Sequence, residues 1–309
     1  MPTAYYTHPV CVLHDPGPGH PEAPARLTAV NDALAISEFD ALHRFEAPEA
    51  APEQLQLMHD AAYVASVLEA VPEQGYISLD PDTALCPASG EAALRAAGGI
   101  CAAIDAVLAG DVENAFCALR PPGHHAERRR AMGFCLFNNV AIAAGHAQSA
   151  HGIERVAVVD FDVHHGNGTQ HMFENDESLF YASSHQWPAY PGTGAASETG
   201  VGNIVNMPLS PGAGSDAFRA AYRDVILPRL REFEPELLLI SAGFDAHQRD
   251  PLCQLNVTTA DFAWLSQALM KVAAEYCSGR LVSSLEGGYD LQALAECASA
   301  HVQALLGDA

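Results

Sequence analysis

Apolar residues recur at helical spacing in six segments of the chain. Between Leu94 and Leu108 they lie three or four residues apart, as on one face of an α-helix, and their neighbours are also small and apolar. We expect this helix to be covered on most of its sides. The segments that the pattern predicts as helices are residues 24–37, 89–109, 137–150, 215–231, 258–277 and 290–306.

Four shorter runs have a continuous rather than alternating apolar character, which is typical of strands buried on both faces. These runs are residues 115–119, 156–159, 237–240 and 281–285. Because helices separate most of them, the connections should be right-handed crossovers and the sheet mostly parallel. No repeat, low-complexity segment or linker divides the chain. We therefore predict an α/β fold in a single domain, residues 1–309, with helices on both faces of a mostly parallel central sheet.

Each strand-like run leads directly into a polar or glycine-rich cluster. In open α/β sheets, ligands bind beyond the carboxyl ends of the strands. Four clusters at one edge should form one functional site. The clusters are Arg120–His125, Asp160–Asn167, Ser241–Asp245 and Glu286–Tyr289.

Acidic and imidazole side chains in two of these clusters have the composition of a metal site. Asp160, Asp162 and His164 alternate where a strand ends, so their side chains should point the same way, and Asp245 follows a different strand. Three protein ligands would leave an open position, as in catalytic zinc sites. The spacing leaves open which two of the three earlier residues are ligands. Acidic residues after a strand also commonly cap the next helix.

The other two clusters suggest proton transfer and oxyanion binding. His124 and His125 lie in a loop that Pro121 and Pro122 stiffen, and an imidazole can take a proton from metal-bound water near neutral pH. The glycines before Tyr289 would let the backbone approach a ligand and direct the phenol toward it. Both features also have simpler explanations, because loop histidines often only form hydrogen bonds and glycine pairs often only make turns.

Composition narrows the function classes. Apolar residues form 49% of the chain and charged residues 17%, which excludes intrinsic disorder. The formal net charge of −23 argues against direct binding to nucleic acid or anionic membranes. No uninterrupted apolar run is long enough to span a bilayer, and the first ten residues lack a signal core, so we expect a soluble, cytoplasmic protein. The eight cysteines form no CxxC pair and should be reduced.

Motifs along nearly the whole chain resemble those of class II histone deacetylases and their bacterial relatives, including acetylpolyamine amidohydrolases. The resemblance implies the arginase/deacetylase fold. The motifs that carry it are HPEAPARL at 20–27, LDPDT at 79–83, RPPGHHAE at 120–127, GFCLFNNVAIAA at 133–144, VDFDVHHGNGTQHMF at 159–173, PGTG at 191–194, SAGFDAHQRDPL at 241–252 and LEGGYDL at 285–291.

The resemblance implies two metal ions. The zinc ligands would be Asp162, His164 and Asp245. A structural potassium ion would lie at Asp160, Asp162, His164, Ser183 and Ser184. The donor set would also accept Fe²⁺ or Co²⁺. Arginase-like enzymes of this fold bind two manganese ions, and Gly166 and His247 stand here where they need acidic ligands, which favours one ion.

The resemblance also implies roles for the remaining site residues. His125 matches the general base and acid, His124 its electrostatic partner, Asp160 the partner of His124, and Tyr289 the phenol that stabilises the transition state. Asn167 replaces an aspartate and should leave His125 neutral. The substrate channel would be lined by Gly133, Phe134, Tyr190, Leu252 and Gly287. Arg26 either braces the inner end of the pocket or forms a surface ion pair.

Two departures from the family pattern concern the substrate. Leu252 stands where polyamine-selective relatives have a glutamate, and Leu85 where class I enzymes have an aspartate that grips the substrate backbone. We therefore predict a zinc-dependent amidohydrolase that deacylates N-acyl-lysine or a related small acylated amine. The alternatives are an acetylpolyamine amidohydrolase and a non-catalytic protein that binds acylated amines. The sequence allows an oligomer and does not define one.

Overall fold

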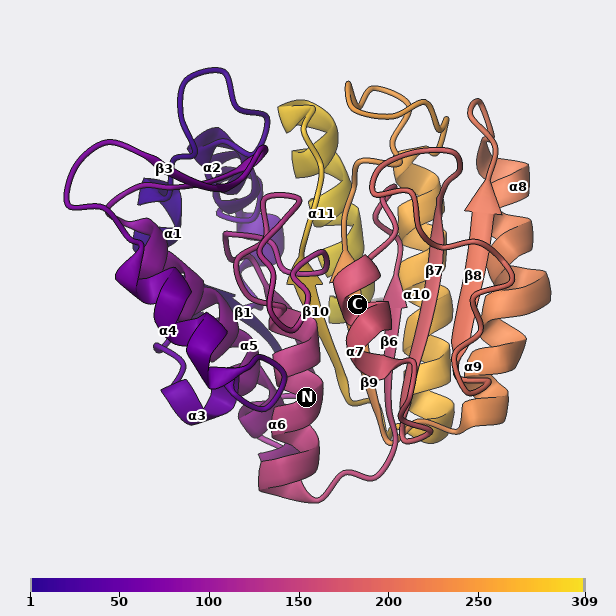
Figure 1. Cartoon of the computed structure of the whole chain (residues 1–309). Coiled ribbons are helices and arrows are strands. Elements are labelled where there is room, and N and C mark those ends of the chain that lie inside the picture. The colour runs from indigo at the N-terminus through magenta and orange to yellow at the C-terminus, as the bar shows by residue number, and fades with distance from the viewer. Residues whose placement is uncertain (1, 308–309) are drawn as a thin grey trace.

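The computed structural model describes residues 2–307, and these contain an eight-stranded sheet in which every pairing is parallel (Figure 1). The strand order is β2-β1-β5-β10-β9-β6-β7-β8. The strands are β1 (Thr3–Thr7), β2 (His43–Glu46), β5 (Asn114–Cys117), β6 (Val156–Asp160), β7 (Leu179–Gln186), β8 (Ile204–Leu209), β9 (Leu237–Ala242) and β10 (Leu281–Leu285). A separate antiparallel pair joins β3 (Ile77–Asp80) to β4 (Thr83–Leu85).

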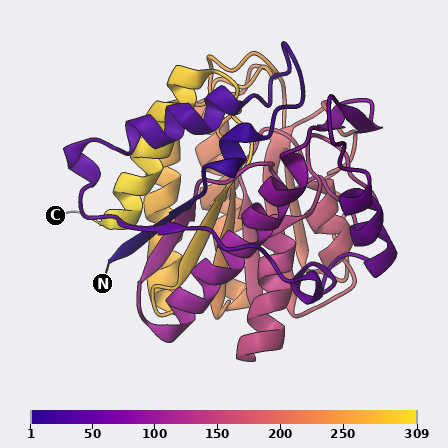
Figure 2. The same cartoon turned by 90° about the vertical axis from the view of Figure 1, so that its left-hand side faces the viewer.

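Helices cover both faces of the sheet, which confirms the predicted three-layer α/β fold (Figures 1 and 2). One face carries α5 (Ser89–Ala109), α6 (Asn139–His151) and α7 (Asn167–Phe173). The other carries α2 (Pro24–Ala33), α9 (Leu227–Phe233), α10 (Thr259–Tyr276) and α11 (Leu291–Leu306). Shorter helices are α1 (Val10–Leu13), α3 (Pro52–Leu55), α4 (Ala61–Glu69) and α8 (Ser215–Ala221), with a 3₁₀ turn at Ser37–Phe39.

All six predicted helices and all four predicted strands are present, with shifted ends. The segment 24–37 stops being helical at Ala33, and 215–231 is two helices joined by a π-helical turn at Tyr222–Ile226. Local sequence explains several ends: Asn138 caps α6 by accepting a hydrogen bond from the Ala141 amide at 3.0 Å, and Gly110 ends α5 in the left-handed conformation. The outer strands β1, β2, β7 and β8 were not predicted.

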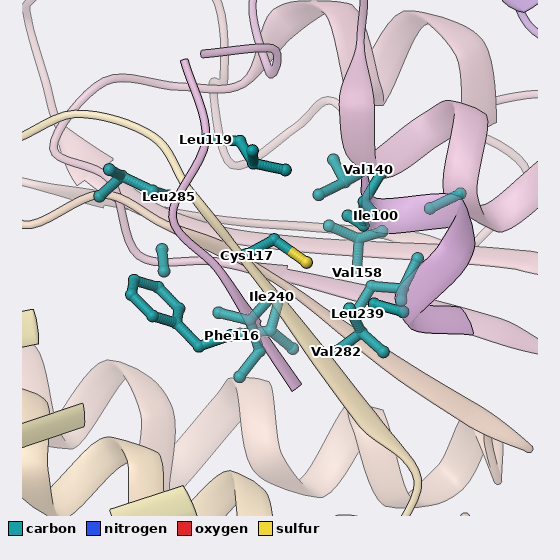
Figure 3. Packing of buried hydrophobic residues seen from close by; sticks show 14 of the residues in the cluster. Ile100, Phe116, Cys117, Leu119, Val140, Val158, Leu239, Ile240, Val282 and Leu285 are labelled. Atoms are coloured by element: carbon teal, nitrogen blue, oxygen red, sulfur yellow. The ribbon is translucent and has the colours of Figure 1, made fainter. Parts of the chain in front are cut away.

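The core covers both faces of the central strands, which pack against α5 and α6 on one face and against α10 and α11 on the other. Figure 3 shows Val158, Leu239 and Val282 of neighbouring strands packed on one face of the sheet with Ile100 of α5 nearby, whereas Phe116 and Ile240 lie on the opposite face. In α5, a side chain at Gly98 or Gly99 would collide with Pro48 or Leu119, so the helix packs too closely for any larger residue. Among the described residues, α5 is the one helix long and apolar enough to cross a membrane, and 61% of its apolar window is buried inside the fold.

The strand register brings the predicted polar clusters to one edge. Asp160 at the end of β6 pairs with Ser241 of β9 and Ser183 of β7, and Ser284 of β10 pairs with both Ser241 and Cys117. The chain reverses its direction of travel across the sheet in this region, since β9 and β10 insert between β5 and β6. Such a reversal is where open α/β sheets bind ligands.

Candidate active site

A pocket of about 200 Å³ opens at this edge of the sheet. It brings together residues from six separate loops. The lining residues are Asp82, His125, Gly133, Phe134, His164, Tyr190, Leu252 and Tyr289. Seven of these eight were predicted from the sequence as catalytic, metal-binding or substrate-binding residues, and Asp82 was not singled out.

Asp162, His164 and Asp245, which we call the ligand triad, meet at the inner end of this pocket. His164 Nδ1 lies 3.1 Å from Asp162 Oδ1 and 3.1 Å from Asp245 Oδ2, and the three potential ligand atoms lie within 4.8 Å of one another. The spacing argument left the choice among Asp160, Asp162 and His164 open, and the structure brings Asp162 and His164 together with Asp245.

The chemistry of the ligand triad fits a divalent cation. Burial and the neighbouring Asp162 carboxylate raise the pKa of Asp245 to about 7, because two buried carboxylates repel one another. A cation between them would remove that repulsion. A side chain at Gly243 or Gly287 would collide with these carboxylates, so the glycines let the backbone close around the triad.

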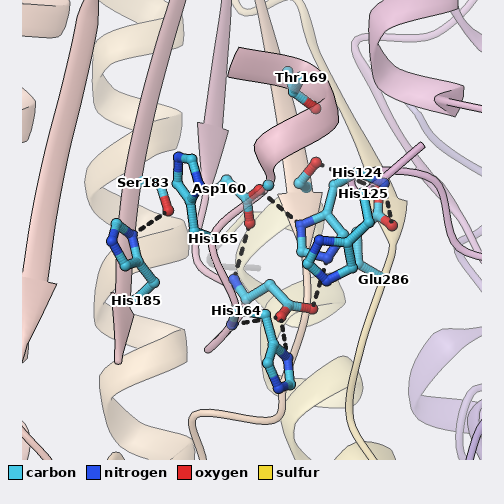
Figure 4. A network of polar contacts seen from close by, with 12 residues as sticks. His124, His125, Asp160, His164, His165, Thr169, Ser183, His185 and Glu286 are labelled. Carbon is cyan, nitrogen blue, oxygen red and sulfur yellow. Dashed lines mark hydrogen bonds and ion pairs between the residues drawn. The ribbon is translucent and has the colours of Figure 1, made fainter. Parts of the chain in front are cut away.

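Asp160 lies beside the triad and contacts His124 (Figure 4). Its Oδ2 lies 2.9 Å from His124 Nδ1 and accepts a hydrogen bond from the Tyr181 hydroxyl at 3.0 Å. Burial disfavours a charged His124, but the carboxylates of Asp162 and Asp160 outweigh it and raise the pKa of His124 to about 10. His124 is therefore positively charged at neutral pH.

His125 has the opposite electrostatic environment. Burial and the charges of His124 and His164 lower the pKa of His125 well below its ordinary value. Its Nδ1 lies 2.8 Å from Asn167 Oδ1, whose orientation is fixed because Asn167 Nδ2 donates to Glu127 Oε1 at 2.9 Å. His125 thus donates through Nδ1 and keeps a lone pair on Nε2 for the pocket. Asn167, which the sequence predicted as the neutral partner of His125, contacts it in the structure.

Glu286 holds the loop that carries both histidines. Its Oε2 accepts hydrogen bonds from the backbone amides of Gly123 at 2.6 Å and His124 at 3.2 Å. A Cβ at Gly123 would lie 2.5 Å from the Asn139 amide nitrogen, so the loop also packs directly on the start of α6. Sequence reasoning noted the two glycines after Glu286 and missed its carboxylate.

Arg26 packs against the ring of Tyr289 and fixes its position. The Arg26 guanidinium lies 4.8 Å from the centre of the Tyr289 ring, and it donates to the carbonyl oxygens of Gly288, at 2.6 Å, and Glu286. Arg26 is fully buried and forms an ion pair with Glu22 at 2.8 Å, so the surface ion pair that the sequence left open is wrong. Burial raises the pKa of Tyr289 well above its ordinary value, which keeps the phenol protonated.

Aromatic rings form the channel walls. Phe134 packs edge-on against Tyr289 with ring centres 5.9 Å apart, and Tyr190 packs edge-on against His125 at 5.2 Å. Phe134 has a φ of 69°, which non-glycine residues rarely adopt, and Thr83 Oγ1 accepts a hydrogen bond from its amide at 3.0 Å. A side chain at the adjacent Gly133 would collide with the His125 ring. Leu252 is 39% exposed at the mouth.

The structure corrects the interpretation of Leu85. This residue is completely buried in the core and does not face the pocket. Asp82, three residues earlier, lines the pocket instead, and its Oδ1 accepts hydrogen bonds from the Thr83 hydroxyl at 2.9 Å and the Gly133 amide at 3.1 Å. The LDPDT motif at 79–83 was noted only as part of the resemblance.

Two serines of β7, Ser183 and Ser184, belong to the predicted potassium site. Ser183 pairs with Asp160 at the end of the neighbouring strand β6. Ser183 Oγ lies 2.9 Å from His185 Nδ1, and Ser184 Oγ lies 2.8 Å from the Tyr222 hydroxyl. Tyr222 in turn donates to the Asp160 backbone oxygen at 3.3 Å. Gly166 packs where any side chain would meet Asp160 Oδ2 and the Tyr181 hydroxyl, so position 166 has no room for a further ligand.

An open parallel sheet with an acidic and imidazole triad, two unlike histidines and a protonated phenol at its switch point has the composition of a metal-dependent hydrolase. Comparison with known proteins specifies the family. The histone deacetylase domain matches residues 20–305. The chain belongs to the histone deacetylase family, as its motifs predicted, and this family hydrolyses the amide bond of acylated amines.

Individual relatives cover nearly all of the chain. The histone deacetylase-like amidohydrolase of Pseudomonas aeruginosa is 37% identical over 99% of this chain and 86% of its own length. The polyamine deacetylase HDAC10 of Homo sapiens is 42% identical over 93% of this chain and 45% of its own. The crystal structure of the HDA15 HD domain superposes with a TM-score of 0.93 at 38% identity, covering 100% of this chain and 89% of that one.

Proposed function

We propose that the chain is a zinc-dependent amidohydrolase that removes acyl groups, chiefly acetyl, from N-acyl-lysine or a small acylated amine. The observation that carries this proposal is the convergence of the ligand triad, a neutral imidazole and a protonated phenol on one pocket. We also propose a cytoplasmic location, membership of class II, and a potassium ion at Asp160 and the adjacent β7 serines.

The ligand triad would hold the zinc ion and leave at least one coordination position open. When bound, a divalent ion polarises the amide carbonyl and makes the attacking water more acidic. Asp162 is further fixed because its Oδ2 accepts a hydrogen bond from the Gly287 amide at 2.8 Å, and Asp245 Oδ1 accepts one from Val163 at 2.8 Å. These contacts orient the carboxylates before any ion arrives.

The two imidazoles have separate tasks in this mechanism. His125 accepts a proton from the attacking water through Nε2, since its Nδ1 already donates to Asn167. It then returns the proton to the departing amine. His124 remains charged between Asp160 and Asp162 and supplies a fixed positive charge beside the reaction. Tyr289 donates its hydroxyl proton to the oxygen on which negative charge develops, as a hydrogen bond.

The pocket also bears on substrate choice. The rings of Phe134 and Tyr190 suit an extended aliphatic chain such as a lysine side chain. At the mouth, Leu252 offers no charge to a second ammonium group, while the Asp82 carboxylate lines the same pocket. Asp82 and the named activity of the human relative favour acetylpolyamines as the second candidate substrate. Leu252 favours acyl-lysine, which we place first.

The test is an assay of an acetyl-lysine peptide and N-acetylputrescine, each with and without a chelator, with metal content measured on the same protein. We expect faster turnover of the peptide, loss of both activities with chelator, and recovery on adding zinc. Failure on both substrates with zinc bound would favour a non-catalytic binding protein. Activity that survives complete metal removal would overturn the mechanism.

A further inference from the structure

A second group of metal-ligating side chains lies far from the pocket, between α5 and α6. Asp105 of α5 faces His146 and His151 of α6, and we call these three residues the helix cluster. Asp105 Oδ1 lies 2.7 Å from His146 Nε2 and 2.6 Å from His151 Nε2. The two rings are nearly perpendicular, with an interplanar angle of 81°. Each imidazole directs its Nε2 atom at one carboxylate oxygen, Asp105 Oδ1.

We propose that the helix cluster is a second binding site for a divalent transition-metal ion such as Zn²⁺. Two imidazole nitrogens and one carboxylate oxygen are ligands that zinc, copper and nickel prefer. The three potential ligand atoms lie within 4.8 Å of one another, as in the ligand triad. The ion would take the place of the two ring protons that now join the histidines to Asp105.

Exposure and charge favour entry of a cation here. The side chain of Asp105 is 54% exposed, that of His151 29% and that of His146 11%, so an ion can arrive from solvent and keep water in its remaining positions. The net charge of −23 attracts cations to the surface as a whole.

Gln54 limits the affinity of the site. Its Nε2 lies 3.5 Å from His146 Nδ1, and its Oε1 accepts a hydrogen bond from the Ala51 amide at 2.8 Å. Coordination through His146 Nε2 would leave a proton on Nδ1 facing the Gln54 amino group. A carboxylate at position 54 would accept a hydrogen bond from that N–H group. Metal-bound histidines commonly have such a partner. The carboxylate would also preserve the contact with Ala51.

The ion would join two helices that pack on the same face of the sheet. His146 and His151 lie about 12 and 20 Å along α6 from Asn138, at a rise of 1.5 Å per residue. Asn138 contacts the carbonyl oxygens of His124 and Ala126. The helix cluster therefore occupies the opposite end of α6 from the catalytic loop. We expect occupancy to stabilise the fold and to leave catalysis unchanged.

The test is equilibrium dialysis of the full chain, with its active-site ion already bound, against a Zn²⁺ series, with zinc counted by mass spectrometry. We expect two ions per chain in the native protein and one in His146→Ala/His151→Ala. His171→Ala, which removes an exposed histidine from α7, is the matched control and should retain two. Gln54→Glu should tighten the second ion by about tenfold.

Thermal unfolding separates a specific site from adventitious binding. Saturation of the second site should raise the Tm of the native protein by about 2 °C or more, and should not raise that of the double variant. With only the active-site ion bound, each variant must have the same Tm as the native protein. One ion in the native protein, or two in the double variant, would overturn the proposal. Neither outcome depends on the hydrolytic activity.

Discussion

The ligand triad and the helix cluster contain the same kinds of side chain in opposite surroundings. The triad has two carboxylates and one imidazole, all buried, whereas the helix cluster has one exposed carboxylate, one exposed imidazole (His151) and one partly buried imidazole (His146). In the triad, Asp245 shares His164 with Asp162, and burial and the Asp162 carboxylate raise the pKa of Asp245 to about 7. In the helix cluster, two histidines already satisfy the single carboxylate.

This difference predicts how much each cluster depends on an ion. A buried pair of like charges needs a cation before both groups can be ionised. An exposed group is screened by solvent, and its interactions change stability little. The triad should therefore decide activity, whereas the helix cluster should affect only stability. Substitutions in and around the two clusters test that contrast.

The largest effect should come from the triad itself. Asp245→Asn keeps the shape of the side chain and an acceptor for the Val163 amide, but it removes a charged ligand. Metal assistance is worth several kcal/mol, so we expect kcat/KM to fall by about 10³ or more. Bound zinc and turnover are measured on the same sample. Native turnover with zinc absent would contradict the assignment.

Loss of the phenol should be the next largest effect. Tyr289→Phe keeps the ring against Arg26 and Phe134 and removes only the hydroxyl. One oxyanion donor is typically worth about 10²–10³ in kcat. We expect kcat to fall by this factor, KM to change little and zinc to remain bound. A fall confined to KM would instead indicate that the hydroxyl binds the ground state.

Glu286 tests whether the histidine loop needs its buried anchor. Glu286→Ala leaves the amides of Gly123 and His124 without their acceptor, and an unsatisfied buried donor costs about 1–3 kcal/mol. We expect lower stability and at least tenfold lower kcat. Glu286→Gln is the matched control: burial raises the pKa of Glu286 to about 7, so a neutral side chain of the same shape is tolerated. Equal losses of stability and kcat in both variants would show that the negative charge of Glu286 matters, rather than its contacts with the histidine loop.

The sequence predicted the centre of the sheet better than its sides, for a physical reason. Strands β6 and β9 are buried on both faces and contain continuous apolar runs, and β10 is equally buried and apolar apart from Ser283 and Ser284. Strand β7 is equally buried, but it ends in Ser183, Ser184 and His185, whose polar groups find partners only in the fold. Strand β2 is a short, exposed edge strand with charged residues, and its pattern resembles a loop.

The same reasoning separates what could be predicted of the site. Asp162, His164 and Asp245 follow strand ends, and the family motifs named all three. The role of Glu286 depends on backbone amides 163 and 162 positions away, which no local pattern indicates. The helix cluster has no sequence signal either. His146 and His151 are five residues apart, and only the packing of α5 on α6 brings Asp105 to them.

A smaller effect is expected from the partner of the general base. Asn167→Asp places a carboxylate against His125 Nδ1 and raises the low pKa of that imidazole. Because a general base must be neutral, the acidic limb of kcat/KM should move to higher pH, by about one unit or more, with little change above pH 8. Glu127→Gln is introduced in both the test and reference proteins, since Glu127 faces the same amide. An unmoved limb would exclude His125 as the base.

The smallest effect on catalysis should come from the helix cluster. Asp105→Asn removes the charge that both histidines share, yet its side chain lies at the opposite end of α6 from the catalytic loop. Exposed ion pairs contribute about 0–1 kcal/mol, so we expect kcat within twofold of native and a Tm within about 4 °C. Steady-state kinetics and thermal unfolding, both in chelator-free buffer, are the measurements. A tenfold loss of kcat would mean that α6 couples the two clusters, and the contrast between them would then fail.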